Sequence, residues 1–181
     1  RRGAVVAIDL DSGGINVLYS SPTYSINQLS NGMNEDDFQT LINDSGKPFF
    51  NRALQGRYPP ASTIKPAIGM YGILNNIVNW DFEMKDPGFF ELPETGRVFR
   101  GWRKGGHGKV NMHKAFLVSS NTYFFSLAYQ ADIEELSNHL FSLGFGQKVC
   151  KDCYDEDQAL VPTPEWKYSV MNAGWVKGDT V

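Results

Sequence analysis

The segment from Pro59 to Pro66 constrains the fold of this chain more than any other. It reads Pro-Pro-Ala-Ser-Thr-Ile-Lys-Pro, and a proline is tolerated in a helix only near its first turn. A helix that contains Pro66 therefore cannot begin much earlier than Ser62. Residues 67–74 are almost all apolar, which is typical of a helix that is buried on every side. The sequence thus predicts a central buried helix with Ser62 at its N-terminal mouth.

Lys65 follows Ser62 at a spacing that places both side chains on one face of such a helix. A serine hydroxyl is a weak nucleophile until a base removes its proton. A lysine amine can be that base when burial or nearby positive charge lowers its pKa. The two residues are a candidate nucleophile and base, although a Ser-x-x-Lys pattern also arises by chance.

Composition excludes some classes of function. A chain of 181 residues with 41% hydrophobic content suits one globular domain with a sizeable core. The net charge of −3 provides no basic field, so we expect no nucleic-acid partner. The longest apolar runs, such as residues 4–8, are too short to span a bilayer. Because the chain starts abruptly before a strand-like run, we expect it to be a piece of a longer protein.

The first third of the chain predicts a hairpin and a long polar connection. Residues 3–9 and 15–19 are β-branched and apolar, and the turn-forming stretch Asp-Ser-Gly-Gly separates them. Residues 25–48 are rich in Asn, Asp, Ser and Gly, which predicts a loop with one short helix at 36–42.

The remainder of the chain is mainly helical in pattern. Residues 85–109 combine glycines, prolines, aromatics and charges, so we expect an irregular β-ribbon with strands at 89–92 and 97–100. Residues 147–181 are predicted to be turns and loop. Apolar spacing predicts three helices, at 111–118, 122–129 and 133–143. A hairpin followed by a run of helices indicates an α+β fold.

A second polar motif, Ser119-Ser120-Asn121, lies at the junction of two predicted helices. On a tight turn, the side chains of Ser119 and Asn121 can both point into one cleft. Ser119 could then relay a proton to the Lys65 amine or to a leaving nitrogen, and Asn121 could hold a substrate amide. An ordinary polar linker has the same composition, so the motif is ambiguous by itself.

Taken together, Ser-x-x-Lys and Ser-x-Asn in this order resemble the motifs of the penicillin-recognising serine acyltransferases. Further stretches are similar to the class B, elongation-specific penicillin-binding proteins of type 2: residues 3–9, 58–66, 86–88, 106–108, 162–167 and 178–180. The resemblance implies the α+β fold of penicillin-binding transpeptidases and serine β-lactamases. It also implies that residues 1–181 are the N-terminal part of a transpeptidase domain.

The resemblance implies a D,D-transpeptidase reaction. Ser62 would attack the penultimate carbonyl of a D-alanyl-D-alanine stem peptide, and the acyl group would pass to an amine on a neighbouring strand. Lys65 would be the base, and Ser119 and Asn121 would move protons and bind the substrate. The Ser62 backbone N–H would supply half of the oxyanion hole. β-Lactam antibiotics would acylate the same serine, and no cofactor is implied.

The resemblance also implies partners and a location. The expected partners are the peptidoglycan stem peptide, a glycan-strand polymerase and rod-shape scaffold proteins of the elongation machinery. The expected location is the periplasmic face of the inner membrane, with an anchor outside this chain.

The sequence departs from the family pattern at the third motif, Lys-Thr/Ser-Gly. Residues 104–106 read Lys-Gly-Gly but precede Ser119, and the Ser-Ile-Asn at 25–27 precedes Ser62, so neither fits the family order. We therefore expect part of the cleft to lie outside residues 1–181. Two alternatives stay open. One is a serine β-lactamase, for which residues 134–138 only approximate the Glu-x-x-Leu-Asn motif, and the other is a non-catalytic β-lactam sensor.

Some relatives hold zinc near the active site with two aspartates, a histidine and a cysteine. Asp86 and His107 fall on two of those positions, but Gly101 and Ser120 occupy the others, so we expect no metal. His107 is then expected in a turn, and His113 and His139 on helix surfaces. For Cys150 and Cys153, we favour a local disulfide over half a metal site or a redox pair.

Overall fold

The computed structural model describes all residues, 1–181, and they divide into two compact units. The first unit comprises residues 1–58 and 148–158, and the second comprises residues 59–147 and 159–181. Each is described by itself. None of the helices is both long and apolar enough to cross a membrane.

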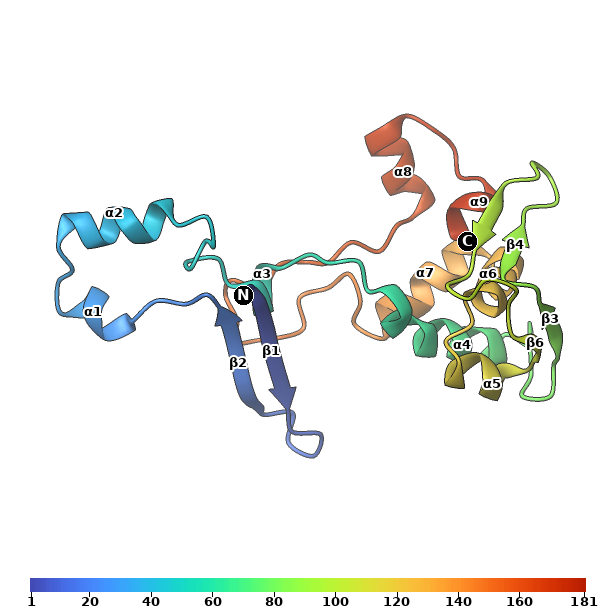
Figure 1. Ribbon diagram of the computed structural model, residues 1–181, viewed down its shortest axis with the longest axis horizontal. Helices are drawn as coiled ribbons and strands as arrows, with labels where there is room; N and C mark the ends of the chain where they lie inside the picture. The colour runs from blue at the N-terminus through green and yellow to red at the C-terminus, as the bar shows by residue number, and fades with distance from the viewer. The chain divides into compact units, whose positions relative to one another are not determined.

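The first unit opens with the predicted hairpin (Figure 1). Strand β1 (Gly3–Ile8) pairs with β2 (Ile15–Ser21) in an antiparallel register. Successive side chains of a strand point to opposite faces. Val5 is 57% exposed and its neighbour Val6 is 48% exposed, so apolar side chains lie open on both faces of the hairpin.

The polar connection that follows contains two helices instead of the single one predicted. They are α1 (Ile26–Ser30) and α2 (Glu35–Asn43). Ser25 and Asn34 cap them by accepting hydrogen bonds from backbone N–H groups, so the residues that suggested a loop are helix starts. A single turn of helix, α3 (Arg52–Gln55), completes this part of the unit.

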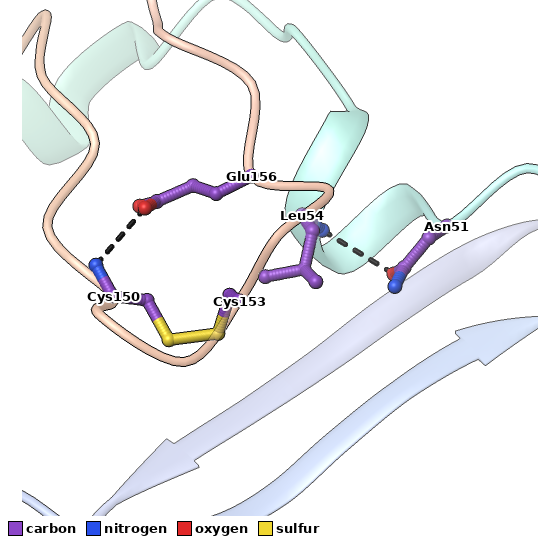
Figure 2. Close-up of a disulfide and its surroundings, with 5 residues drawn as sticks. All are labelled: Asn51, Leu54, Cys150, Cys153 and Glu156. Atoms are coloured by element: carbon purple, nitrogen blue, oxygen red, sulfur yellow. Dashed lines mark hydrogen bonds between the residues drawn. A yellow bond between two sulfur atoms is a disulfide. The ribbon is translucent and has the colours of Figure 1, made fainter.

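A disulfide joins Cys150 and Cys153, as predicted (Figure 2). The loop that carries it is attached to the rest of the first unit. The backbone N–H of Asp157 donates to the carbonyl of Leu54 over 2.9 Å, and the Asp157 carboxylate pairs with the Arg57 guanidinium.

The central helix of the second unit begins later than the sequence suggested. Residues Ala61–Ile64 form a 3-10 turn that contains Ser62, and α4 spans Lys65–Leu74. The helix is also not buried on every side, since Met70 is 40% and Leu74 is 65% exposed. Its buried face packs on the neighbouring helices, and this tertiary asymmetry cannot be read from an apolar run alone.

The three helices that the apolar spacing predicted are present, and each packs against α4. They are α5 (Met112–Leu117), α6 (Asn121–Gln130) and α7 (Ile133–Ser142). Their shared core contains Tyr71, Val110, Met112, Ala115, Tyr123, Phe124 and Leu127, all nearly inaccessible to solvent. This core anchors both the start of α4 and the junction between α5 and α6.

The excursion before α5 is built from two small antiparallel pairs. The ribbon expected at 89–92 and 97–100 is β4 (Phe89–Glu91) with β5 (Val98–Arg100). The other pair is β3 (Met84–Asp86) with β6 (Gly108–Val110), and it places Asp86 opposite Gly108. Together with the helices, these pairs give the predicted α+β class.

The C-terminal residues are more helical than predicted. They form α8 (Pro164–Met171) and α9 (Lys177–Thr180). The Thr163 side chain accepts a hydrogen bond from the Trp166 N–H, and Pro164 occupies the first turn. A capping threonine followed by proline is a helix-start signal, which the sequence interpretation missed.

Candidate active site

The four predicted site residues come together in the second unit. Ser62 lies in the 3-10 turn, Lys65 begins α4, and Ser119 and Asn121 lie where α5 gives way to α6. The Ser119 hydroxyl donates a hydrogen bond to Ser62 Oγ over 3.0 Å. Residues from two distant parts of the chain therefore meet at the candidate nucleophile.

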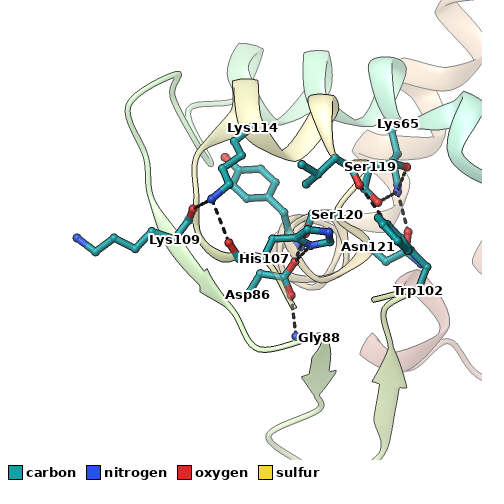
Figure 3. A network of polar contacts seen from close by, with 12 residues as sticks. Lys65, Asp86, Gly88, Trp102, His107, Lys109, Lys114, Ser119, Ser120 and Asn121 are labelled. Carbon is teal, nitrogen blue, oxygen red and sulfur yellow. Dashed lines mark hydrogen bonds and ion pairs between the residues drawn. The ribbon is translucent and has the colours of Figure 1, made fainter. Parts of the chain in front are cut away.

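Lys65 binds the turn at three oxygen atoms, two of which belong to Ser119 (Figure 3). Its Nζ donates to the Ser119 hydroxyl and carbonyl, each over 2.9 Å, and to Asn121 Oδ1 over 2.7 Å. Ser119 thus connects the amine to Ser62. Sequence spacing suggested that Lys65 reaches Ser62 along the helix, whereas the hydrogen-bonded route runs through Ser119.

The surroundings of Lys65 favour a basic role. The residue is 8% exposed, and Nζ lies 5.4 Å from the centre of the Phe124 ring. Burial lowers the pKa of the Lys65 amine, because the charged form loses water. A larger fraction of this amine is neutral, and so able to accept a proton, than for a lysine in water.

The turn between α5 and α6 has an unusual backbone. Ser119 adopts φ of +50°, in the left-handed region that residues other than glycine rarely occupy. Ser120 is fully buried, and its Oγ caps α6 by accepting from the Tyr123 N–H over 3.2 Å. The Trp102 indole N–H donates to the carbonyl of Val118 over 3.1 Å. Sequence reasoning missed Trp102, for which an isolated tryptophan among glycines was the only signal.

A buried polar cluster lies beside Ser120 of the turn (Figure 3). Asp86 Oδ2 accepts hydrogen bonds from the Ser120 hydroxyl and from His107 Nδ1, each over 2.7 Å. Its Oδ1 accepts from the Gly88 N–H over 2.8 Å. Burial raises the pKa of Asp86, but these hydrogen bonds outweigh burial and lower it below the ordinary value. His107 lies just before β6 and not in a turn, and its side chain is buried and paired with Asp86, which the sequence did not reveal.

This cluster does not fit the zinc site of the family. The position that would supply a second aspartate is Gly101, where an added Cβ would meet the Gly88 carbonyl oxygen at 3.2 Å. Ser120 offers a neutral hydroxyl where a thiolate would stand, and that hydroxyl is bound to Asp86. His107 Nε2 is buried without a hydrogen-bond partner, which leaves one ring nitrogen and one carboxylate. Two such ligands do not make a tetrahedral site.

Of the residues weighed for other roles, Glu135 and His139 have structural partners. Glu135, in the near match to a β-lactamase motif, accepts a hydrogen bond from the Tyr71 hydroxyl over 3.2 Å. His139 Nε2 lies 3.1 Å from the Ala67 carbonyl oxygen on α4, so this histidine is packed between helices and is only partly exposed. His113 is exposed on α5, as expected.

Comparisons with known proteins show the family of the chain. Residues 3–181 match the family model of the penicillin-binding protein transpeptidase domain. The chain is 45% identical over its whole length to peptidoglycan D,D-transpeptidase MrdA from Acinetobacter baumannii, of which it covers 27%. It therefore spans about a quarter of the length of that relative.

Solved structures give the same result. A crystal structure of Pseudomonas aeruginosa PBP2 in complex with WCK 5153 superposes on the chain with a TM-score of 0.94 and 35% identity, covering 99% of this chain and 41% of that one. PBP2 in its complex with MreC from Helicobacter pylori has a TM-score of 0.93 and 34% identity, with 99% and 33% covered. The chain therefore belongs to the penicillin-binding protein transpeptidase family and, within it, to the penicillin-binding protein 2 group.

Proposed function

We propose that the protein is a serine-type peptidoglycan D,D-transpeptidase in which Ser62 is the nucleophile. The observation that carries this proposal is the hydrogen-bonded chain from Ser62 through Ser119 to Lys65. It supplies what an acyl transfer requires, namely a hydroxyl, a base of lowered pKa and a group that passes the proton between them.

The proton follows this chain in two directions. When Ser62 Oγ attacks the penultimate D-alanine carbonyl, its proton passes to the Ser119 hydroxyl, and Ser119 passes its own proton to the neutral Lys65 amine. When the carbon–nitrogen bond breaks, Lys65 returns a proton through Ser119 to the nitrogen of the leaving D-alanine. An incoming amine on a neighbouring strand then releases the acyl group from Ser62 by the same route.

Two groups orient the substrate in this proposal. The Asn121 side chain lies beside Lys65 and is available to bind a peptide amide. The Ser62 backbone N–H is one oxyanion donor. We assign the second donor to the Lys-Thr/Ser-Gly strand of the family, a motif that residues 1–181 do not contain after Asn121.

The proposed partners follow from the family. The substrate is a peptidoglycan stem peptide, and β-lactam antibiotics acylate Ser62 in its place. The MreC complex of the Helicobacter PBP2 supports a rod-shape scaffold partner for this protein as well. A glycan-strand polymerase would supply the strands that are cross-linked. We propose that the reaction takes place at the periplasmic face of the inner membrane.

Labelling with a fluorescent penicillin tests the proposal. In the full-length protein we expect one covalent label on Ser62, located by mass spectrometry, and no label after Ser62→Ala. Ser25→Ala is the matched control, because Ser25 also begins a Ser-x-Asn sequence but caps α1 in the first unit. Labelling that survives Ser62→Ala would contradict the assignment of the nucleophile.

The lifetime of the label separates the proposal from a β-lactamase. Glu135 is bound to the Tyr71 hydroxyl, and we assign no base to a deacylating water. The penicilloyl-enzyme should therefore persist for many minutes, whereas a β-lactamase would release it within seconds. Release of D-alanine from a stem pentapeptide, with transfer to an acceptor amine, separates the transpeptidase from a sensor that only binds.

A further inference from the structure

We propose that Asp86, held by His107, is a positioning residue that fixes the turn 119–121 through Ser120 and does so without a metal ion. This inference rests on the proposed function, because the turn supplies every side chain that binds Lys65.

The turn needs support from outside itself. Ser119 has φ of +50°, and a non-glycine residue in this region is held at a cost of the order of 1 kcal/mol or more. All three oxygen atoms that bind Lys65 Nζ belong to this turn. A relaxation of Ser119 toward ordinary φ would therefore move both the proton relay and the amide oxygen away from the amine.

Asp86 provides that support at the next residue. Ser120 is fully buried and Asp86 is 2% exposed, so water cannot replace the 2.7 Å hydrogen bond between them. The same carboxylate accepts from His107 and from the Gly88 N–H, and these bonds fix its orientation. Asp86 itself stands on β3, which β6 holds in place. The carboxylate is thus a rigid anchor for the middle of the turn.

Trp102 anchors the other side of Ser119. Its indole N–H donates to the carbonyl of Val118, and its ring centre lies 5.2 Å from that of His107. The strained residue is therefore held at the position before it by Trp102 and at the position after it by Asp86, and His107 contacts both anchors.

Hydrogen bonds replace metal coordination in this cluster. In the resembling family a zinc ion can occupy this place, but here two of the four ligand positions are Gly101 and Ser120. No group of three or more His, Cys, Asp or Glu side chains gathers there or elsewhere in the chain. Asp86 therefore holds the turn through hydrogen bonds and not through a metal ion.

Penicillin acylation of the full-length protein tests this role, with the acylation rate constant measured separately from the dissociation constant of the non-covalent complex. Asp86→Asn places an amide NH₂ toward at least one donor, because both carboxylate oxygens accept hydrogen bonds. We expect the rate constant to fall about 10- to 100-fold, since a displacement near 1 Å has such effects. The dissociation constant should change little.

Three further variants isolate the cause. Combining Asp86→Asn with Ser120→Ala should lower the rate no more than the worse single change, because both break one connection. Trp102→Phe keeps a ring on His107 but removes the N–H, so it should slow acylation about two- to tenfold without threatening the fold. Lys109→Met is the matched control on the same strand pair, since this side chain is 84% exposed, and it should leave the rate unchanged.

The outcomes distinguish the two proposals. A wild-type protein that takes up no penicillin contradicts the proposed function. A wild type that is acylated, with Asp86→Asn and Trp102→Phe acylated equally fast, contradicts the positioning role alone. Loss of wild-type acylation after chelation, or stoichiometric zinc in the purified protein, would overturn the metal-free assignment.

Discussion

At the scale of single residues, Lys65 links the two motifs. Three oxygen acceptors stabilise the charged form of its amine, whereas catalysis requires the neutral form. Burial shifts the balance toward the neutral form by lowering the pKa of Lys65. The residue is therefore held in place in one protonation state and reactive in the other.

This balance predicts how acylation depends on pH. The pKa of Lys65 in the folded protein lies below 10.5, so the acylation rate should rise with pH through that lowered pKa and then level off. Lys65→Arg keeps the positive charge, but a guanidinium group cannot accept a proton. The acylation rate should therefore fall by about 100-fold or more and should no longer rise with pH. Lys85→Arg, on an exposed part of β3, is the control.

The lowered pKa of Lys65 also determines how the free energy of unfolding changes with pH. Between the lowered pKa of Lys65 and 10.5, the unfolded chain binds more protons than the folded one, so stability should increase with pH in this window.

A pH-independent acylation rate in the wild type, or an arginine variant that reacts normally, would exclude Lys65 as the base.

At the scale of elements, local signals explain which helices the sequence revealed. The helices α5, α6 and α7 combine apolar spacing with capping residues, and each buries a face. By contrast, α8 buries none of its residues, and its apolar residues Tyr168, Val170 and Met171 are exposed, so its cap is the signal that marks it. The one-sided burial of α4 depends on its neighbours, which a local pattern does not encode.

Close packing between α4 and α6 gives a prediction for Gly72. An added Cβ at this position would lie 2.6 Å from Leu127 Cδ1 and 3.1 Å from Val78 Cγ2. Alanine gains up to about 1 kcal/mol of helix propensity over glycine, but overpacking a core costs about 1–3 kcal/mol. We therefore expect Gly72→Ala to lower the melting temperature of the full-length protein.

A second background checks the reason. Leu127→Ala removes the side chain that the new methyl group would meet. In this background Gly72→Ala should be much less destabilising or neutral, because the 2.6 Å contact is removed and only the 3.1 Å contact with Val78 Cγ2 still opposes the gain in helix propensity. A destabilisation of equal size in both backgrounds would show that the clash with Leu127 is not the cause.

At the scale of the whole molecule, the candidate site was more predictable than its support. Ser62, Lys65, Ser119 and Asn121 follow from two short motifs in a fixed order, and their meeting depends only on the family fold. The cluster around Asp86 joins β3, β6 and the turn across more than 30 residues of sequence. No short sequence motif predicts this cluster of residues, so only the structure reveals it.

The hairpin β1–β2 indicates that residues 1–181 are part of a larger fold. Val5, Val6, Ile8, Ile15 and Val17 are each at least 40% exposed, although they are strong strand formers. An isolated two-stranded hairpin is marginal in water, and exposed apolar strands favour association. We propose that further strands of the transpeptidase domain pair with this hairpin in the full-length protein.

This proposal predicts a difference between the segment 1–181 and the full-length protein. The segment carries Ser62, Lys65 and the turn, but only one of the two expected oxyanion donors. Removal of one such donor costs about 100- to 1,000-fold in rate. We therefore expect the segment to be acylated by penicillin about two or more orders of magnitude more slowly, and to melt at a lower temperature. Stopped-flow acylation of both proteins measures the ratio, with Ser62→Ala as the blank for each. Equal rates would show that the third motif is dispensable and that residues 1–181 already form the complete reacting site.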